Sequence, residues 1–429
     1  MAKLNIHNDW LPLDNAAKIY PSSASVKSPA EFRIFATMTE PVRLLYLQHA
    51  LERVMPRFPY FQVSLRRGFF WYYLQRHSRV PKVELMENVP VGIISIKDRT
   101  AAMIRVSTRG SDIAADFSHI LTDGNGGLRF FLTLLAEYVR ISGSSVGSHP
   151  NLIDLDQTPA PEEFEDAHRT QFFAGKTPAP EKMPSAYHIP GRPFLSRRYS
   201  LIDGRAPVDK VLHAAKKHGV TLTEYLAAVY MRAVVRIYQE EEQRRRKPRR
   251  SIIRMEIPVD MRRYYPSTTM RNFSLFLSPE IDMKLGHYTF SEILTEVHHR
   301  IQILKSRKQL QRQISRNVGA ELKPFIRFAP LFVKDLVISS VYTKLGEQLH
   351  SGVISNLGRV DLPAEMEPFI RSLHFVLSPN HIMKKCCAAL SFRDELFISF
   401  GSVIEDRRLE RYFFQHLVED DIPVTVKEL

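Results

Sequence analysis

One pattern constrains the fold of this chain more than any other: two adjacent strand-like runs followed by a helix, once in each half. The strand-like runs are rich in apolar side chains and are joined by short turns, as in β-hairpins. The helical runs then repeat apolar residues at a spacing of three to four. The runs are 103–108, 112–120 and 126–139 in the first half, and 387–392, 396–403 and 406–418 in the second. The repetition predicts a pseudo-duplicated fold of strands and helices.

The stretch between the two copies, residues 141–196, has a different character. It is rich in proline and shows little apolar periodicity, which is typical of a connection between halves. We therefore predict an N-terminal subdomain over residues 1–150, a proline-rich crossover linker over 151–195 and a C-terminal subdomain over 196–429.

Capping residues and glycines mark further elements. Gly219 has the position of a residue that ends a helix, and Thr221 and Glu224 have the spacing of a capping box that begins the next one. The other expected elements are a helix from Pro41 to Val54, a strand over 68–75, a strand near 196–202, a helix over 208–218 and a helix over 290–304. Segment 10–21 is apolar and is expected to fold against the body.

The chain is basic, with 60 Lys and Arg residues against 46 Asp and Glu residues and a net charge of +14. Such a chain attracts anions in general, whether nucleic acid, an anionic membrane or the phosphates of coenzyme A. The densest basic run, Arg244 to Arg250, follows three glutamates and lacks interleaved aromatic residues for base stacking. We interpret it as a solvated loop, expect no nucleic-acid partner and retain peripheral membrane contact as an open alternative.

Two further features bear on location. Residues 1–9 contain no apolar signal-peptide core, and no run of eighteen apolar residues occurs. Cys386 and Cys387, the only cysteines, are adjacent, so they are poorly placed to link distant segments and have no metal-ligand spacing. These features predict a protein without a transmembrane segment in a reducing cytoplasm.

His119 is the most informative candidate for chemistry. It ends the strand-like run 112–120 and is followed by Leu-Thr-Asp-Gly and then a helix. Ile113, Ala115, Phe117 and His119 share one face by period-two alternation, so the imidazole lies at the end of an apolar row. Side chains at such boundaries often face clefts, and an imidazole with an ordinary pKa near 6.5 suits a general base.

Four segments of this sequence together resemble one known family. They are Phe117–Gly124 with its His-x-x-x-Asp-Gly motif, Ala50–Tyr60, Ile257–Arg262 followed by Arg271-Asn272-Phe273, and Ser355–Gly358. In this order they resemble the CoA-dependent acyltransferase superfamily, which includes chloramphenicol acetyltransferases, alcohol acetyltransferases and the condensation domains of peptide synthetases. The likeness spans nearly the whole chain.

The resemblance implies an α/β fold of the two-layer α+β sandwich type. Two chloramphenicol-acetyltransferase-like subdomains would form a pseudo-dimer with an active-site tunnel between them. It also implies an acyl thioester as donor, either acyl-CoA or an acyl carrier protein, and a small-molecule alcohol or amine as acceptor. Both would be substrates, and no tightly bound cofactor is expected.

The resemblance further assigns roles to individual residues. His119 would be the general base, while Asp123 would point away from the tunnel and pair with an arginine of the other half, holding the loop in shape. Arg262 matches that arginine best, with Arg254 and Arg263 as the alternatives. Gly124 would supply the turn, since it tolerates unusual dihedral angles.

Asn272 and Asn356 match motif positions near the interface between the halves, and neither is assigned as the oxyanion donor. The sequence departs from two branches of the family. Ser118 precedes His119 in place of the second histidine of many condensation domains, and Ser355–Arg359 replaces the Asp-Phe-Gly-Trp-Gly motif of plant enzymes. Both departures favour a stand-alone alcohol acyltransferase and leave the donor undecided between CoA and a carrier protein.

Other chemistries fit the residues less well. His298 and His299 are adjacent on a predicted helix and point about 100° apart, and the spacing of His119 and Asp123 crosses a turn, so no metal site is expected. Gly143–Gly147 matches G-x-S-x-G but follows a helix rather than a strand. Direct acyl transfer in a ternary complex is therefore the preferred function. The alternative is a non-catalytic condensation-like domain that binds a carrier or partner protein.

Overall fold

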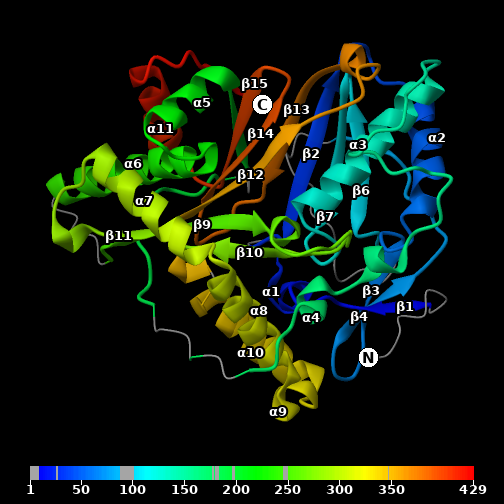
Figure 1. Cartoon of the computed structure of the whole chain (residues 1–429), viewed down its shortest axis with the longest axis horizontal. Coiled ribbons are helices and arrows are strands. Elements are labelled where there is room, and N and C mark those ends of the chain that lie inside the picture. The colour runs from blue at the N-terminus through cyan, green and yellow to red at the C-terminus, as the bar shows by residue number, and fades with distance from the viewer. Residues whose placement is uncertain are drawn as a thin grey trace.

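A computed structural model describes most of the chain. The described residues are 9–25, 28–86, 101–175, 178, 183–195, 199–244, 250–345 and 347–429, and the side chains of 339–345 are left out of the description. Figure 1 shows two lobes of strands and helices side by side, with a third group of helices and short strands below them.

The first lobe is a mixed sheet covered by two helices. Its strand order is β13-β2-β7-β6-β5, and α2 and α3 pack together over the sheet. In the core between them, the ring of Phe117 contacts the rings of both Phe32 and Phe130. The elements are β2 (Glu31–Met38), α2 (Leu44–Val54), β5 (Glu84–Leu85), β6 (Ile104–Arg109), β7 (Asp112–Ser118), α3 (Gly124–Ile141) and β13 (Ile370–Leu377).

The second lobe has a larger sheet, with eight strands in the described residues. Its order is β10-β9-β12-β14-β15-β8-β16, with β11 also paired to β9, and α6 packs against both α7 and α11. The strands are β8 (Ser200–Pro207), β9 (Ile252–Asp260), β10 (Ser274–Leu277), β11 (Glu280–Asp282), β12 (Gly352–Val360), β14 (Lys385–Phe392), β15 (Glu395–Ser402) and β16 (Thr425–Glu428). The helices are α5 (Val208–Lys217), α6 (Leu222–Gln243), α7 (Phe290–Leu304) and α11 (Arg408–Glu419).

Strands β14 and β15 separate the two hydrophobic cores. Because successive side chains of a strand point to opposite faces, Ala388 and Leu390 enter the core of the first lobe while Cys387 and Ala389 enter that of the second. Every residue of β14 is buried, as expected for a strand covered on both sides.

One strand crosses from the second half of the chain into the first lobe. β13 pairs antiparallel with β2, placing Phe375 opposite Ile34. The division of the chain at residues 150 and 195 remains a prediction. Because β13 belongs to the second half of the chain and pairs within the sheet of the first lobe, it connects the two lobes.

The third group of elements lies at the lower end of both lobes (Figure 1). A three-stranded sheet in the order β1-β4-β3 lies near a group of helices. Its strands are β1 (Trp10–Pro12), β3 (Val63–Arg67) and β4 (Tyr72–Arg76), and the helices are α1 (Tyr20–Ser23), α4 (Ala167–Thr170), α8 (Arg307–Leu322), α9 (Pro324–Arg327) and α10 (Leu331–Leu345).

The predicted local elements are largely confirmed. Both hairpins and the helices after them are present, and α7 has the predicted bounds. Thr221 and Glu224 form the expected capping box, and Gly219 follows α5 with φ +70°.

Two boundaries were wrong, and a third falls partly outside the described residues. Helix α2 begins at Leu44 rather than Pro41. Gly68 belongs to the turn before β4, because its N–H donates to the carbonyl of Trp71. The second-lobe strand β8 begins at Ser200, whereas the prediction began at residue 196 and its residues 196–198 lie outside the described part of the chain.

No helix in the described residues is both long and apolar enough to span a bilayer. Of the basic run, residues 245–249 lie outside the described part of the chain, so its interpretation as a loop stays a prediction.

Candidate active site

A cavity of about 390 Å³ lies between the two lobes. Its wall comes from both halves of the chain, so neither lobe alone could form it. The lining residues include Tyr20, Ala30, His119, Asp123, Gly124 and Asn125 from the first half and Thr223, Glu256, Asp260, Arg263, Asn356, Leu357, Phe375 and Cys386 from the second.

His119 lies directly after the last residue of β7 and is half-buried in this wall. Its backbone is fixed at both ends, since its N–H donates to the carbonyl of Ala30 at 2.8 Å and its carbonyl accepts from Asn272 Nδ2 at 2.9 Å. The imidazole stacks on Tyr20 with ring centroids 5.4 Å apart and lies 4.8 Å from the ring of Phe32. These contacts leave the ring few orientations.

Burial lowers the pKa of His119 to about 4, against smaller opposing effects of the Asp123 charge and a backbone hydrogen bond at Thr122. An imidazole in a poorly hydrated site disfavours its charged form. His119 is therefore neutral at neutral pH and has a ring nitrogen that can accept a proton.

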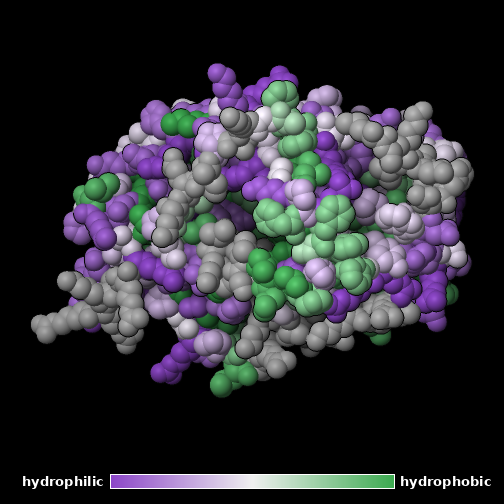
Figure 2. Space-filling model, turned by 90° about the horizontal axis from the view of Figure 1, so that it is seen from below, coloured by the Kyte–Doolittle hydropathy of each residue, from purple (hydrophilic) through white to green (hydrophobic). Residues whose placement is uncertain are grey.

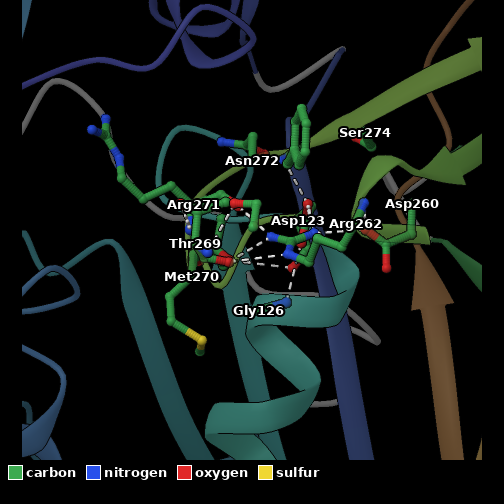
Figure 3. A network of polar contacts seen from close by, with 12 residues as sticks. Asp123, Gly126, Asp260, Arg262, Thr269, Met270, Arg271, Asn272 and Ser274 are labelled. Atoms are coloured by element: carbon green, nitrogen blue, oxygen red, sulfur yellow. Dashed lines mark hydrogen bonds and ion pairs between the residues drawn. The ribbon is translucent and has the colours of Figure 1, made fainter. Parts of the chain in front are cut away.

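Asp123 caps α3 and uses both carboxylate oxygens for structure (Figure 3). Oδ1 accepts from the N–H of Gly126 at 3.1 Å, while Oδ2 accepts from the N–H of Phe273 at 2.8 Å and from Arg262 Nη1 at 2.9 Å. Burial would raise the pKa of Asp123, but Arg262 and the two amides outweigh it and lower that pKa below its ordinary value. The carboxylate is thus ionised and held by the loop of the other lobe.

Arg262 ties three segments together at this junction (Figure 3). Besides Asp123, its guanidinium donates to Asp260 at 2.9 Å and to the carbonyls of Thr269 and Arg271 at 2.7–3.0 Å. Burial, followed by the charge of Asp123 and opposed by Arg262, raises the pKa of Asp260. Each guanidinium nitrogen of Arg262 thus has an acceptor, and these hydrogen bonds connect the end of β9, the start of α3 and the loop before β10.

The two alternative arginines lie elsewhere. Arg254 is fully buried, pairs with Glu280 and donates to the carbonyls of Pro184 and Leu349. Arg263 lines the cavity. Of the three arginines considered, Arg262 is the one paired with Asp123.

Contrary to the prediction, Gly124 does not lie in the turn. The turn between β7 and α3 is at residues 119–121, and Gly124 is already the first residue of α3, without a positive φ, so the helix begins two residues earlier than Gly126. A Cβ on Gly124 would lie 2.8 Å from Cδ2 of Leu357 and 3.6 Å from Cζ of Phe375. Gly124 is thus set apart by close approach of the second half rather than by an unusual dihedral angle, and an added Cβ would require the end of the Leu357 side chain to shift.

The two asparagines have different surroundings. Asn272 is only 2% exposed, and its Nδ2 donates to Asp14 as well as to the His119 carbonyl, so it holds the backbone of the histidine. Asn356 lines the cavity, where its Nδ2 donates to Oγ1 of Thr223 at 3.1 Å and its Oδ1 accepts from the N–H of Gly358 at 2.8 Å.

Two cavity residues were missed from the sequence. Tyr20 lies in a short helix far along the chain from His119, and no local pattern relates the two. Glu256 lies in β9, and burial followed by the charge of Glu347 raises its pKa to about 7. Its Oε2 is 3.4 Å from Nδ1 of His350. A lone acidic residue among Ile252–Ile257 was a readable signal, because isolated charges are costly in central strands.

Cys386 also lines the cavity, but burial and then the charge of Glu256 raise the pKa of its thiol well above the ordinary value. A thiol that stays protonated is a poor nucleophile. In the part of the chain that the structure describes, no cluster of three or more His, Cys, Asp and Glu residues is arranged to hold a metal ion.

Comparison of the sequence with known families and with curated proteins gives no match. Comparison of the structure with solved structures gives many. Polyketide synthase associated protein 5 from Mycobacterium tuberculosis is 12% identical, with a TM-score of 0.58 over 94% of this chain and 96% of that one. The wax ester synthase/diacylglycerol acyltransferase from Marinobacter aquaeolei VT8 is 14% identical, with a TM-score of 0.56 over 96% and 98% of the two chains.

The condensation domain of the monacolin K polyketide synthase is similar to the same degree, at 12% identity and a TM-score of 0.56 over 96% of this chain and 97% of that one. At such identities the likeness establishes the fold. The chain has the chloramphenicol-acetyltransferase-like α/β fold in two similar halves, which is the fold of the CoA-dependent acyltransferases and condensation domains. The fold class inferred from the four sequence segments is confirmed.

Proposed function

We propose that this protein is an acyltransferase that moves an acyl group from a thioester to an alcohol or amine, with His119 as general base. One observation carries the proposal: the imidazole of His119, stacked on Tyr20 and carried by a backbone whose carbonyl accepts from Asn272 Nδ2, lines a cavity that both lobes form. The shared fold with a wax ester synthase/diacylglycerol acyltransferase and with condensation domains supports it.

The chemistry is direct transfer in a ternary complex. His119 accepts the proton of the acceptor hydroxyl or amine while the acceptor oxygen or nitrogen attacks the thioester carbonyl carbon. The tetrahedral intermediate then collapses, the carbon–sulfur bond breaks, and the departing thiolate takes the proton from the imidazolium. The products are an ester or amide and a free thiol. No acyl-enzyme is needed, in keeping with the raised thiol pKa of Cys386.

Asp123 and Arg262 are positioning residues in this scheme. The carboxylate is committed to Gly126, Phe273 and Arg262, and through them it fixes the start of α3 against the loop of the other lobe. Gly124 leaves room for Leu357 and Phe375 of the second half, and Asn272 donates to the His119 carbonyl. These contacts position the imidazole in the cavity, and the residues that make them take no part in proton transfer.

The donor is proposed to be acyl-CoA or an acyl carrier protein. Both carry phosphate, and the net charge of +14 favours their capture. Several structural neighbours are peptide synthetase and polyketide synthase proteins, which supports a carrier-bound donor, whereas the wax ester synthase/diacylglycerol acyltransferase supports a free thioester.

The proposal is tested by thiol release. Acyl-CoAs of graded chain length are incubated with a panel of alcohols and amines, and free thiol is measured with the wild type, His119→Ala and the matched control His299→Ala. His299 is exposed on α7 and does not line the cavity. We expect acceptor-dependent thiol release that His119→Ala alone removes. Equal release by folded His119→Ala would exclude His119 as the base.

A second candidate is a protein-binding role without catalysis. One observation favours it: an X-domain from teicoplanin biosynthesis, with a TM-score of 0.51 to this chain, was solved in complex with OxyB. A carrier or partner protein that binds both the wild type and His119→Ala equally, with no thiol release from any donor, would favour this role.

A further inference from the structure

A cluster of exposed apolar side chains lies on the lower face of the molecule, with hydrophilic residues around it (Figure 2). It lies at the turn between β3 and β4 and on α9 and α10, which Figure 1 places at the end opposite α5 and α11. We call it the apolar face, and its members are Phe69, Phe70, Phe325, Phe328, Phe332, Val333 and Val337. We propose that the apolar face docks onto an anionic lipid surface.

The exposure of these side chains is high. Phe69 and Phe325 are each 72% exposed and Phe332 is 67% exposed. Other exposed apolar residues, such as Leu45 and Leu285, belong to separate elements, α2 and the segment after β11. Single exposed apolar residues are common on protein surfaces, whereas a contiguous cluster of phenylalanines usually marks a contact surface.

The apolar face is held together by specific contacts. The N–H of Leu331 donates to the carbonyl of Phe69 at 2.9 Å, and the ring of Phe70 lies 6.2 Å from that of Phe328. Lys334 is only 4% exposed, and its Nζ donates to the carbonyls of Phe70 and Arg327 at 2.7 and 3.1 Å and lies 3.7 Å from the ring centroid of Trp71. The hairpin turn and the helices therefore present their phenylalanines as one preformed surface.

The charge around the apolar face is positive. Residues 305–345 contain nine Lys and Arg residues against two Asp and Glu residues. Both acids are paired, Asp335 with Arg67 at 3.2 Å and Glu321 with Lys18 at 2.6 Å. Lys323 and Arg327 are exposed beside the phenylalanines. Protruding apolar side chains flanked by cations match the interface of an anionic bilayer, where the former enter the acyl boundary and the latter meet the headgroups.

The shape favours a bilayer over a protein partner. Phe69 and Phe70 occupy a hairpin turn, and Phe325 and Phe328 occupy the corner between α8 and α10, which projects at the lower edge of Figure 1. Of the two tryptophans of the chain, Trp71 lies directly before β4, in the turn that carries Phe69 and Phe70, and Trp10 lies in β1 of the adjoining sheet. Tryptophan is favoured at membrane interfaces, because its ring is apolar and its N–H is polar.

The apolar face is also close to the cavity. Helix α10 packs against α1, where Oγ of Ser22 donates to Asp335 at 2.7 Å, and Tyr20 of α1 stacks on His119. If the proposed acyl transfer holds, docking would bring the cavity next to membrane-dissolved substrates. The docking itself does not depend on that function.

Vesicle flotation tests the docking without any substrate. Vesicles of phosphatidylcholine alone and of phosphatidylcholine mixed with phosphatidylglycerol are used with wild type and with the triple variant Phe69→Ser, Phe325→Ser and Phe332→Ser. We expect the wild type to float with the mixed vesicles, and the triple variant to partition at least about tenfold more weakly. The matched control is Leu45→Ser, Leu85→Ser and Leu285→Ser, which removes equally exposed residues elsewhere and should bind like the wild type.

The outcomes separate the alternatives. No flotation of the wild type, or equal flotation of the triple variant, would overturn the proposal. Sedimentation that shows wild-type dimers, lost in the triple variant, together with no vesicle binding, would assign the apolar face to a second copy of the chain instead. His119→Ala should float like the wild type, so failure of the acyl-transfer proposal would leave this result unchanged.

Discussion

The two hairpin-to-helix junctions of this molecule have the same order of elements and different surroundings. In the first lobe the chain leaves β7 at Ser118, passes His119 and enters α3 after Asp123. In the second lobe it leaves β15 at Ser402, passes Ile404 and enters α11 at Arg408. The first junction opens on the cavity between the lobes, and the second is paired with the crossover segment.

The crossover segment contacts the second junction directly. Pro193 forms a β-bridge with Ile404, and the N–H of Glu405 donates to the carbonyl of Arg192 at 3.0 Å. Ile404 is 1% exposed, and a Cβ on Gly191 would lie only 2.6 Å from its Cδ1. A tightly packed isoleucine takes the region where the first lobe has a histidine facing the cavity.

The acids at the two junctions also differ. Asp123 reaches across to Arg262 in the other lobe, whereas Asp406 pairs at 2.8 Å with Arg408 only two residues away, which in turn pairs with Glu240 of α6. The first ion pair joins two lobes, and the second joins a helix start to its own lobe. The repeated topology thus gives both junctions the same order of elements. The second junction is covered by the crossover segment, whereas the first faces the cavity.

The largest expected effect is on catalysis, which should depend on the first junction and not on the second. His119→Ala should lower acyl transfer by about 10² to 10⁴, the usual contribution of a positioned general base. Ile404→Ala should keep turnover per folded molecule. Thiol release measured after circular dichroism has verified folding makes the comparison. A folded His119→Ala protein with wild-type turnover would show that the first junction is no more catalytic than the second.

The inter-lobe ion pair gives the next largest effect. Asp123→Ala and Arg262→Ala should each lower the free energy of unfolding by about 3 to 5 kcal/mol, because each leaves a buried charge without its partner. The double variant should lose clearly less than the sum, as expected for residues in contact. Urea unfolding of the four proteins measures this. Strict additivity would mean that the pair does not couple the lobes.

The second junction should respond through stability alone. Ile404→Ala should cost about 2 to 5 kcal/mol and Ile404→Val about 0.5 to 1.5 kcal/mol, since both remove buried methyl groups from a packed site. Urea unfolding midpoints should fall in that order while thiol release stays constant. A loss of activity without a loss of stability would assign the second junction a role in the cavity.

Much of this comparison was visible in the sequence, because it depends on local patterns. Alternation and helical spacing located both hairpins and the helices after them, and the Thr221–Glu224 spacing marked the start of α6. The resemblance carried by four segments in order, one of them Ile257–Arg262, directed attention to Arg262. Each element was located from a pattern among its own neighbouring residues, and only the choice of Arg262 used distant segments.

What the sequence did not reveal depends on contacts between distant segments. The pairing of β13 with β2 joins residues more than three hundred positions apart, and period-two alternation does not identify the partner of a strand. The stacking of Tyr20 on His119 and the hydrogen bond from Asn272 to the His119 carbonyl also join distant segments, so no local pattern predicts them. Gly124 was assigned to the turn, because a glycine that lies close to another segment looks the same in sequence as one required by a dihedral angle.

The remaining prediction concerns pH and again separates the two junctions. The pKa of His119 falls from an ordinary value of 6.5 to about 4 on folding, so between these values the unfolded chain binds more protons than the folded one. Stability contributed by the neutral imidazole is therefore fully present above about pH 6.5 and is lost as the pH falls toward 4. The free energy of unfolding of the wild type should decline relative to that of His119→Gln across this window. The matched variant Ile404→Ala keeps the imidazole, so its difference from the wild type should stay constant. Urea unfolding at several pH values measures both differences, and a wild type that stays parallel to His119→Gln would show that the imidazole titrates normally and faces bulk water rather than the cavity.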